Sequence, residues 1–379
     1  MKNRIKALGE GTNRIDGVLK VTGTASYATD FPVKNVAHAY LIKSTIAAGK
    51  IADIDASAAE KAPGVLAILT HKNAPKVRAA NLRGGGVLQN DQIEYFGQNI
   101  GAVVAETFEQ ARYAAGLIKV KYEKSEPKVD FKKHLKEAAR PKAEDRQDVF
   151  RGDVEAALQT AEFKVEEVYV TPIEHHQPLA PHATIAYWEA ADKLTLYNES
   201  QVVNGVQNAL AGTFGLKPEN VRVITPHVGG GFGSKGGAWG HVVVAAMAAQ
   251  AVKRPVKLAL TRQMMFNSVG LRQKNVQRLR LAATKDGKLT AVAHETTTHC
   301  AVNAEFVEPC GDCAKMMYDA PNSKISYRVA PMNIIIPTFN RAPGKSTGSF
   351  ALESAIDELA YKLKIDPVEF RLKNEPAKD

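Results

Sequence analysis

Hydrophobic and polar positions change over short distances in the first part of the chain, and this pattern predicts strands and helices in alternation. Residues 51–54 and 65–70 have the apolar composition of strands, and residues 56–62 between them favour a helix that Pro63 ends. The same order returns as a strand at 100–105, a helix at 108–117 and a strand at 118–122. Two such strand–helix–strand units indicate a compact α/β domain over residues 14–123.

A different composition follows at residues 124–147, where charged residues and two prolines occur without a sustained apolar face. This composition is typical of a solvated linker, and residues 134–139 favour a short helix within it. The linker separates the first domain from a second region, which extends over residues 148–379.

The second region has longer hydrophobic patterns. Residues 203–214 repeat apolar positions with the period of an amphipathic helix, and the alanine-rich residues 238–252 predict another helix. The strands predicted at 276–283 and 289–298 are joined by Lys285-Asp286-Gly287, a sequence that favours a hairpin. Further strands are predicted at 194–198, 221–225, 256–261 and 334–336, and a further helix at 350–363, with a short turn restarting at Pro367.

The composition is that of a globular protein. Of 379 residues, 45% are hydrophobic and 24% are charged, which excludes disordered and collagen-like chains, and three cysteines are too few for a disulfide framework. The longest apolar run, residues 241–252, is too short to span a membrane, and the first residues lack the apolar core of a signal peptide. The sequence therefore predicts a cytoplasmic protein without a membrane span, unless a partner carries it out.

Positive charge is concentrated in one segment. The formal net charge is +10, and residues 220–285, the acid-free segment, contain neither aspartate nor glutamate. A basic pocket without carboxylates would attract a phosphate-like group, on a cofactor or on a nucleic acid. Aromatic side chains for base stacking are limited here to Phe232, Trp239 and Phe266, which argues against nucleic acid. The basic residues are Arg222, Lys235, Lys253, Arg254, Lys257, Arg262, Arg272, Lys274, Arg278, Arg280 and Lys285.

A glycine-rich loop, residues 229–236, stands between a predicted strand and a predicted helix. Its bare backbone amides can converge on an anionic group, although a glycine cluster can also be only a flexible turn. Gly231, Gly233 and Gly236 match the dinucleotide fingerprint, but no acidic residue follows about 20 positions later to bind a ribose. A P-loop is excluded because no serine or threonine follows Lys235.

A second loop, Arg341-Ala342-Pro343-Gly344, follows the apolar run 334–336 and precedes the last long helix. The guanidinium fork of arginine can pair with a phosphate or an oxo group, while proline and glycine fix the turn. The alternative is a surface arginine on an ordinary connection.

Motifs spread over nearly the whole chain carry a family resemblance. They are Arg14-Ile15-Asp16-Gly17, Lys20-Val21-Thr22-Gly23, Pro63-Gly64-Val65, Tyr95-Phe96-Gly97-Gln98, Gln201, the loop 229–235, Arg254-Pro255-Val256-Lys257 and the loop 341–344. Together they resemble the molybdenum-binding large subunit of the molybdenum hydroxylases, the xanthine dehydrogenase and aldehyde oxidase family. His175-His176, residues 307–311 and residues 350–354 are most similar to its bacterial, aldehyde-oxidising branch, which uses a cytosine-dinucleotide cofactor.

The resemblance implies an α+β fold. A small α/β hammerhead-like domain, residues 14–123, is followed after the linker by the first part of a molybdopterin-binding domain of mixed sheets and helices, residues 148–379. The implied activity is that of a molybdopterin-dependent hydroxylase or dehydrogenase, which oxidises an aldehyde or an N-heterocycle with water as the oxygen source. The implied cofactor is molybdenum–molybdopterin, in the cytosine-dinucleotide form for that branch. Electrons would leave through an iron–sulfur subunit and an FAD subunit.

The cofactor contacts that the resemblance implies fall on the two loops and one glutamine. They are Gln201, Gly230, Gly231, Phe232, Gly233, Arg341 and Ala342. Gln201 would donate to an oxo ligand of molybdenum, Phe232 and Gly233 would offer backbone contacts, and no side chain is expected to ligate the metal directly. A glutamine amide and backbone N–H groups can orient an oxo anion without adding negative charge, although an exposed polar role for Gln201 is the simpler alternative.

The sequence also departs from the family. The family's catalytic glutamate lies in a C-terminal half, beyond Asp379, so the catalytic residue stays unknown. Leu179-Ala180-Pro181 stands where relatives carry methionine–glutamate–proline, and Lys345 stands where many carry glutamate. These changes affect the substrate side of the expected site and leave the expected fold intact.

Two hypotheses follow for the function. The chain is either the first half of a split or truncated enzyme, active only when another polypeptide supplies the C-terminal half, or a non-catalytic remnant that holds the cofactor or acts as a scaffold. The resemblance also leaves export to the periplasm open, because large subunits of this branch resemble proteins carried by the signal of a partner.

Overall fold

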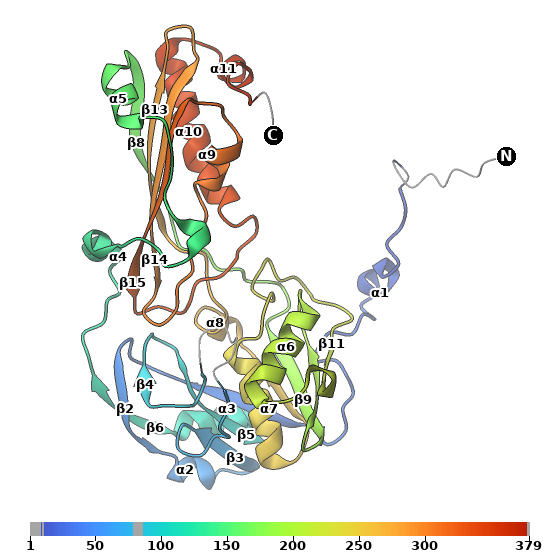
Figure 1. The fold of residues 1–379 in the computed structure, drawn as a ribbon. Coiled ribbons are helices and arrows are strands. Elements are labelled where there is room, and N and C mark those ends of the chain that lie inside the picture. Colours follow the sequence, from blue (N-terminus) through green and yellow to red (C-terminus); the bar gives the residue numbers. More distant parts are fainter. Residues whose placement is uncertain (1–8, 10, 79–85, 377–379) are drawn as a thin grey trace, which may run out of the picture.

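The computed structural model describes residues 9, 11–78 and 86–376, and within them the α+β class expected from the sequence is confirmed. Figure 1 shows two lobes, one above the other in that view. The lower lobe contains a seven-stranded and a three-stranded sheet, and the upper lobe contains a five-stranded sheet. A short helix, α1 (Gly17–Val21), lies on an arm outside both lobes and buries none of its residues.

The seven-stranded sheet forms the centre of the lower lobe, in the order β11-β10-β9-β12-β1-β5-β3. Its strands are β1 (Ala37–Lys43), β3 (Val65–Thr70), β5 (Asn99–Ala105), β9 (Ala183–Ala190), β10 (Lys193–Asn198), β11 (Val221–Ile224) and β12 (Val256–Ala259). Because β1 lies parallel to β12, with Ala37 opposite Val256, the sheet combines strands from both sides of residues 124–147. The division of the chain into two domains at these residues stays a prediction.

Two long helices pack on this sheet. α6 (Val203–Phe214) and α7 (Gly240–Val252) correspond to the helices predicted at 203–214 and 238–252. α6 ends at Gly215, whose φ of +68° forms the left-handed cap that glycine adopts without strain. α7 consists mainly of alanine and valine, so it can approach β9 and β12 closely, and most of its residues are buried.

The three-stranded sheet, in the order β4-β2-β6, forms an outer layer of the lower lobe. Its strands are β4 (Gln92–Ile93), β2 (Gly49–Asp55) and β6 (Lys119–Lys124). The helices α2 (Ser57–Glu60) and α3 (Phe108–Leu117) share an apolar cluster with this sheet, and α3 packs mainly against β1 and β5. The predicted strand–helix–strand units are therefore split, since β2 and β3 lie in different sheets, as do β5 and β6. Burial explains this division, because every residue of β5 is buried, as in a central strand, whereas β6 is largely exposed.

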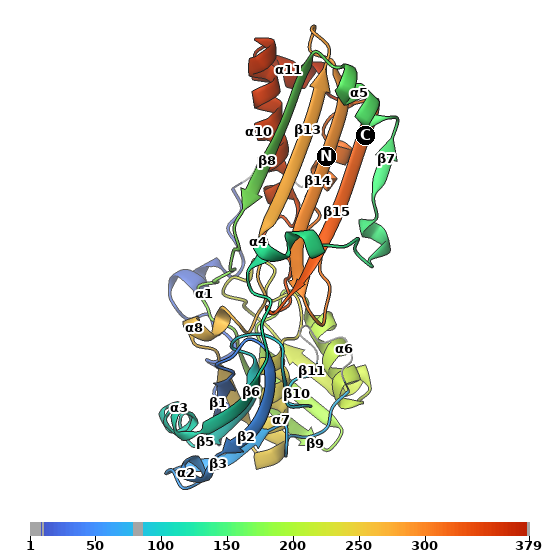
Figure 2. The same cartoon turned by 90° about the vertical axis from the view of Figure 1, so that its left-hand side faces the viewer.

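The upper lobe is built on the five-stranded sheet β7-β15-β14-β13-β8, whose strands lie side by side in Figure 2. They are β7 (Val149–Arg151), β8 (Phe163–Thr171), β13 (Asn275–Ala283), β14 (Leu289–Ala301) and β15 (Asn322–Met332). The predicted hairpin is confirmed, because β13 and β14 are antiparallel with Arg278 opposite Glu295. α10 (Lys345–Leu363) packs along β8 and β13 and buries Leu352 and Leu359 in the core of this lobe.

Shorter elements complete the described part of the fold. They are α5 (Val154–Thr160), α8 (Arg262–Met265), α9 (Asp312–Met316), α11 (Pro367–Lys373) and the single turn η3 (Pro218–Asn220). α11 replaces the turn predicted at Pro367, because Asp366 caps it by accepting from the N–H groups of Val368 and Glu369. No helix formed by residues 9, 11–78 and 86–376 is both long and apolar enough to cross a membrane.

Two connecting segments differ from their predictions. Residues 124–147 form α4 (Phe131–His134) and the turns η1 (Leu135–Glu137) and η2 (Glu144–Arg146), and the burial of Phe131 against β15 shows that this linker is packed as well as solvated. The run 334–336 is not a strand, because β15 ends at Met332 and residues 335–340 are irregular. Ile335 instead joins the core of the lower lobe, which explains the apolar composition of the run.

Candidate cofactor site

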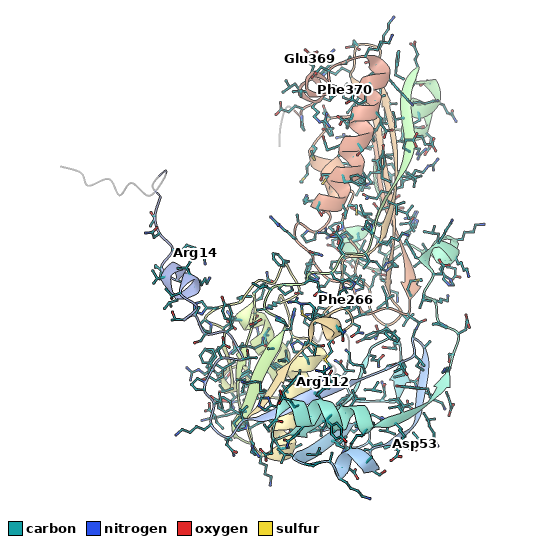
Figure 3. The ribbon with its side chains drawn as sticks, turned by 180° about the vertical axis from the view of Figure 1, so that it is seen from behind. Arg14, Asp53, Arg112, Phe266, Glu369 and Phe370 are labelled. Atoms are coloured by element: carbon teal, nitrogen blue, oxygen red, sulfur yellow. The ribbon has the colours of Figure 1, made fainter. Side chains whose placement is uncertain are left out.

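Three segments meet at the junction of the lobes. Gln201 follows β10, and the glycine loop, residues 229–236, follows β11, so the parallel pairing of these strands brings both to one edge of the sheet. The third segment, residues 339–344, is called the Arg341 loop and precedes α10 of the upper lobe. Figure 3 labels Phe266 at this junction, and the centroid of its ring lies 4.7 Å from that of His175.

Hydrogen bonds connect the predicted site residues directly. Gly233 donates its N–H to Gln201 Oε1 at 3.0 Å. Gln201 donates its own N–H to the carbonyl of Lys235 at 2.8 Å, and Arg341 donates its N–H to the carbonyl of Phe232 at 3.0 Å. The structure therefore brings Gln201, Phe232 and Arg341 together, while their contact with a cofactor stays a prediction.

The segments approach so closely that a Cβ atom would collide at two glycine positions, and Gly233 is the one that requires glycine. A Cβ on Gly233 would lie 2.2 Å from the carbonyl oxygen of Phe339, and a Cβ on Gly231 would lie 2.4 Å from Gln201 Oε1. Gly233 also has a φ of +106°, a conformation that side-chain-bearing residues rarely adopt. Part of the glycine run is therefore fixed by contact with other loops and is not a freely flexible turn.

One residue in the glycine loop and one in the Arg341 loop have a strained backbone conformation. Phe232 has a φ of +54° and Ala342 a φ of +55°, although neither is glycine. This left-handed conformation costs a non-glycine residue roughly 1–2 kcal/mol, and residues in it gather at binding sites. Arg341, the residue before Ala342, donates its N–H to the carbonyl of Phe232, so the two strained residues lie on either side of one contact between the loops.

Unused donors lie next to this contact. Because Gln201 Oε1 accepts from Gly233, the orientation of the side-chain amide is fixed, and its Nε2 has no acceptor among the described residues. The backbone N–H groups of Gly230, Gly231 and Phe232 also lack an acceptor in the described part of the chain. The N–H of Gly233 is donated to Gln201, and the predicted backbone contact of Gly233 with a cofactor stays a prediction.

The expectation of a basic pocket without carboxylates is wrong. Five cations of the acid-free segment pair with acids that lie outside it in sequence. Lys235 pairs with Glu199, and Arg272 lies 2.6 Å from Glu174 and 3.3 Å from Glu308, measured between nitrogen and oxygen. The remaining pairs are Arg254 with Glu106, Arg278 with Glu166 and Glu295, and Arg280 with Glu155 and Glu295. Five of the eleven cations that the sequence places in this segment are thus compensated by acids in space.

A buried ion pair also holds the Arg341 loop. Arg272 donates to the carbonyls of Asn340 and Arg341, the latter at 2.6 Å. Glu308 accepts from the N–H of Gly344 at 2.6 Å and is fully buried, and this burial raises the pKa of its carboxyl group. The side chain of Arg341 is exposed without an ion-pair partner among the described residues, and it lines a cavity of about 470 Å³ together with Arg272.

The positions that depart from the family lie near the same loops. Ala180 donates its N–H to the carbonyl of Gly229 at 3.2 Å, and its own carbonyl accepts from the Lys235 ammonium group at 3.0 Å. Lys345 is exposed in the first turn of α10, where a cation interacts unfavourably with the helix dipole. His176 lies deeper and contacts the carbonyl of Phe339 through Nε2 at 2.6 Å.

Sequence reasoning missed the roles of the residues behind the loops. It treats Lys235 and Arg272 as free cations, whereas both are buried and donate to backbone carbonyls. It does not single out Glu199 or Glu308, the acids that pair with them. Their positions in the sequence could have pointed to these two acids. Glu199 stands two residues before Gln201, and Glu308 lies within the family-like residues 307–311.

Comparisons with known proteins agree with this architecture. Residues 136–375 match the family model of the molybdopterin cofactor-binding domain, and residues 22–126 match that of the aldehyde oxidase and xanthine dehydrogenase a/b hammerhead domain. The aldehyde oxidoreductase molybdenum-binding subunit PaoC of Escherichia coli (strain K12) is 38% identical over 379 residues, which cover 100% of this chain and 51% of that protein. The nicotinate dehydrogenase large molybdopterin subunit of Eubacterium barkeri is 26% identical, over 97% of this chain and 89% of that subunit.

Solved structures show the same fold. The aldehyde oxidoreductase from Desulfovibrio gigas superposes with a TM-score of 0.85 at 26% identity, covering 96% of this chain and 43% of that protein. Quinoline 2-oxidoreductase from Pseudomonas putida 86 superposes with a TM-score of 0.86 at 22% identity, over 96% of this chain. The chain spans about half the length of most of these relatives. From the family matches and the shared fold, the chain belongs to the molybdopterin cofactor-binding family of aldehyde oxidases and xanthine dehydrogenases.

Proposed function

We propose that this chain holds one side of a molybdopterin cofactor within a hydroxylase that oxidises an aldehyde or an N-heterocycle with water as the oxygen source. One observation carries the proposal: the unused donor of Gln201, the strained backbone at Phe232 and the exposed Arg341 meet at the lobe junction. Two of these groups come from the lower lobe and one from the upper lobe, so the fold has to be complete before they meet.

The donors present fit an anionic cofactor. The free N–H groups of Gly230, Gly231 and Phe232 are consecutive, and successive amides in such a turn form a concave anion site. Gln201 Nε2 adds a neutral side-chain donor, which can orient an oxo group and leaves the local charge unchanged. Arg341 adds a positive charge that no described carboxylate neutralises.

The chemistry would be divided between the cofactor and this chain. When bound, molybdenum–molybdopterin would supply the redox step, and the residues described here would orient it and limit access of bulky groups. The similarity to PaoC, which is named as an aldehyde oxidoreductase molybdenum-binding subunit, supports an aldehyde as the substrate. The cytosine-dinucleotide form of the cofactor is proposed from the family resemblance of residues 175–176, 307–311 and 350–354. The electrons would pass to iron–sulfur and FAD groups on partner subunits.

The length of one relative bears on how the proposed activity would be divided among polypeptides. Because this chain covers 89% of the nicotinate dehydrogenase large molybdopterin subunit, a molybdopterin subunit of similar extent exists in another enzyme. This supports the hypothesis that a second polypeptide supplies the C-terminal half, including the glutamate expected to act as the base. The alternative of a non-catalytic, cofactor-holding scaffold is favoured by the departures at Ala180 and Lys345.

Metal and pterin analysis tests the proposal. The chain is purified alone and together with its partner subunits, and molybdenum and the pterin nucleotide are measured per mole of chain. We expect both in the assembled preparation, with oxidation of a small aldehyde. Molybdenum without turnover in the complete assembly would support the scaffold alternative, and the absence of molybdenum and pterin from both preparations would contradict cofactor binding altogether.

A further inference from the structure

The side chain of Lys235 is fully buried behind the glycine loop, with 0% of its surface exposed. Its ammonium group donates to the carboxylate of Glu199, to the carbonyl of Ala180 at 3.0 Å and to the carbonyl of Val228 at 2.7 Å. A lysine ammonium has three donors, so all of them are used within the protein. The acceptors come from three different segments, which Lys235 therefore ties together.

The same segments are also connected closer to the site. Glu199 and Lys235 pair through their side chains, Gln201 donates its N–H to the carbonyl of Lys235, and Gln201 Oε1 accepts from Gly233. These contacts join residues 199–201 to residues 233–235 at successive points. The position of the free Gln201 Nε2 relative to Phe232 consequently depends on where Lys235 is held.

We infer that Lys235 is a positioning residue, which together with Glu199 sets the distance between Gln201 Nε2 and the free N–H groups of residues 230–232. The inference deepens the proposed function and rests on it for the identity of the ligand. Lys235 does not itself touch the ligand, because its donors are all engaged and its side chain is buried. The Lys235–Glu199 pair also has no net charge, so it contributes geometry to the site and does not attract an anion.

A plain contribution to stability has to be separated from positioning. Lys235→Met alone would leave the carboxylate of Glu199 buried without a partner and would destabilise the whole lobe. Lys235→Met combined with Glu199→Gln removes both charges and keeps similar volumes, a change that buried pairs often tolerate. The double variant still lacks the donors to Ala180 and Val228, so it removes the positioning contacts, and we expect it to keep the fold because no buried charge is left unpaired.

The experiment compares the wild type, the double variant and the control Lys119→Met, which alters an exposed lysine of β6. Each is prepared with its partner subunits. Hydrogen exchange is followed by mass spectrometry in peptides covering residues 199–203 and 228–236 and in peptides of the upper lobe, and bound molybdenum and the absorption spectrum of the cofactor are recorded. In the double variant we expect exchange about tenfold faster in those two peptides and unchanged exchange in the upper lobe. We also expect a loss of more than about half of the bound molybdenum, with a changed spectrum for the remainder.

Several outcomes would overturn the inference. Wild-type exchange and molybdenum content in the double variant would show that Lys235 does not position the site. Exchange that rises equally in both lobes would show that the pair only stabilises the fold. If the wild type itself holds no molybdenum, the proposed function fails, whereas the exchange of residues 228–236 still reports on whether Lys235 fixes the loop.

Discussion

The two loops that meet at the lobe junction are each supported by a buried ion pair, and the two pairs differ in their further partners. The glycine loop rests on Lys235 paired with buried Glu199, and the Arg341 loop rests on Arg272 paired with buried Glu308. Both cations also donate to backbone carbonyls of the adjoining segments. In each case a buried charge pair supports a loop that contains a strained, non-glycine residue.

The two ion pairs differ because Arg272 has a second acidic partner and Lys235 does not. The planar fork of Arg272 also reaches Glu174, whose side chain is 45% exposed, whereas Lys235 has a single carboxylate partner and no exposed one. An arginine presents five donors in a fixed plane, and a lysine gathers three donors on one atom. The Arg341 loop is therefore linked to the protein surface, and the glycine loop is anchored entirely inside. Removing individual partners should show how much each anchor contributes.

The largest effect is expected from Arg272→Met. This change leaves Glu308 buried without its cation and removes the donors to the carbonyl groups of Asn340 and Arg341. Breaking a buried pair on one side costs about 3–5 kcal/mol of the free energy of unfolding, to be measured by chemical denaturation. Arg222→Met, an exposed arginine of β11, serves as the control and should change that free energy by less than about 0.5 kcal/mol. A loss for Arg272→Met no larger than that of the control would show that the Arg341 loop does not depend on this pair.

Acid should lower the free energy of unfolding through a buried histidine in the five-stranded sheet of the upper lobe. His294 of β14 is completely buried, and burial lowers its pKa from 6.5 to about 4. The unfolded chain binds a proton at His294 below about pH 6.5, whereas the folded chain binds it only below about pH 4. The contribution of neutral His294 to the free energy of unfolding is therefore complete above pH 6.5. It is lost as the pH falls through this window and amounts to about 3 kcal/mol.

His294→Gln tests this pH dependence. The variant should lose part of the decrease in the free energy of unfolding between pH 6.5 and pH 4, because glutamine does not titrate. His241 of α7, whose pKa burial lowers to about 3, provides the corresponding group in the lower lobe. An unchanged slope in His294→Gln over this pH range would mean that other groups account for the acid sensitivity.

The close contact between the loops can be tested with two alanine substitutions. Gly233→Ala places a Cβ against the backbone carbonyl of Phe339 at a φ of +106° and should cost about 2 kcal/mol of the free energy of unfolding. Gly231→Ala meets only side-chain atoms, the Oε1, Cδ and Cγ of Gln201, and this side chain can rotate away, so the cost should stay below about 1 kcal/mol. Thermal denaturation compares them, and equal losses would show that the loops are not in the close contact described.

The sequence was sufficient where local chemistry decides the structure. α3 begins and ends as predicted because Thr107 and Gln110 form a capping box at its start. The hairpin of β13 and β14 follows from the turn at Lys285-Asp286-Gly287. Gln201 and the glycine loop are assigned to one site by the family resemblance, and the structure brings them together because the strands that precede them, β10 and β11, are parallel neighbours.

The sequence was insufficient where distant segments pair. β5 and β6 are adjacent in the chain but belong to different sheets, and this choice depends on which strand the core can bury completely. Five cations of the acid-free segment pair with acids from other parts of the chain, and Glu295 of β14, opposite Arg278 of β13, is one of these acids. Because such partners are fixed by the topology of the sheets, a count of charges along the chain overstates the local positive potential.

The smallest effect is expected from Glu174→Gln, which removes the exposed partner of Arg272. Exposed ion pairs contribute less than about 1 kcal/mol, and salt screens them, so the loss should shrink further in high salt. Glu308→Gln is the matched change at the buried partner and should cost more, about 2 kcal/mol, at any salt concentration, because the remaining groups cannot turn to water. Denaturation of both variants at low and high salt provides the measurement. Equal, salt-sensitive losses would mean that the Arg341 loop is anchored mainly at the surface, and the distinction between the interior anchor at Glu308 and the exposed contact at Glu174 would have to be abandoned.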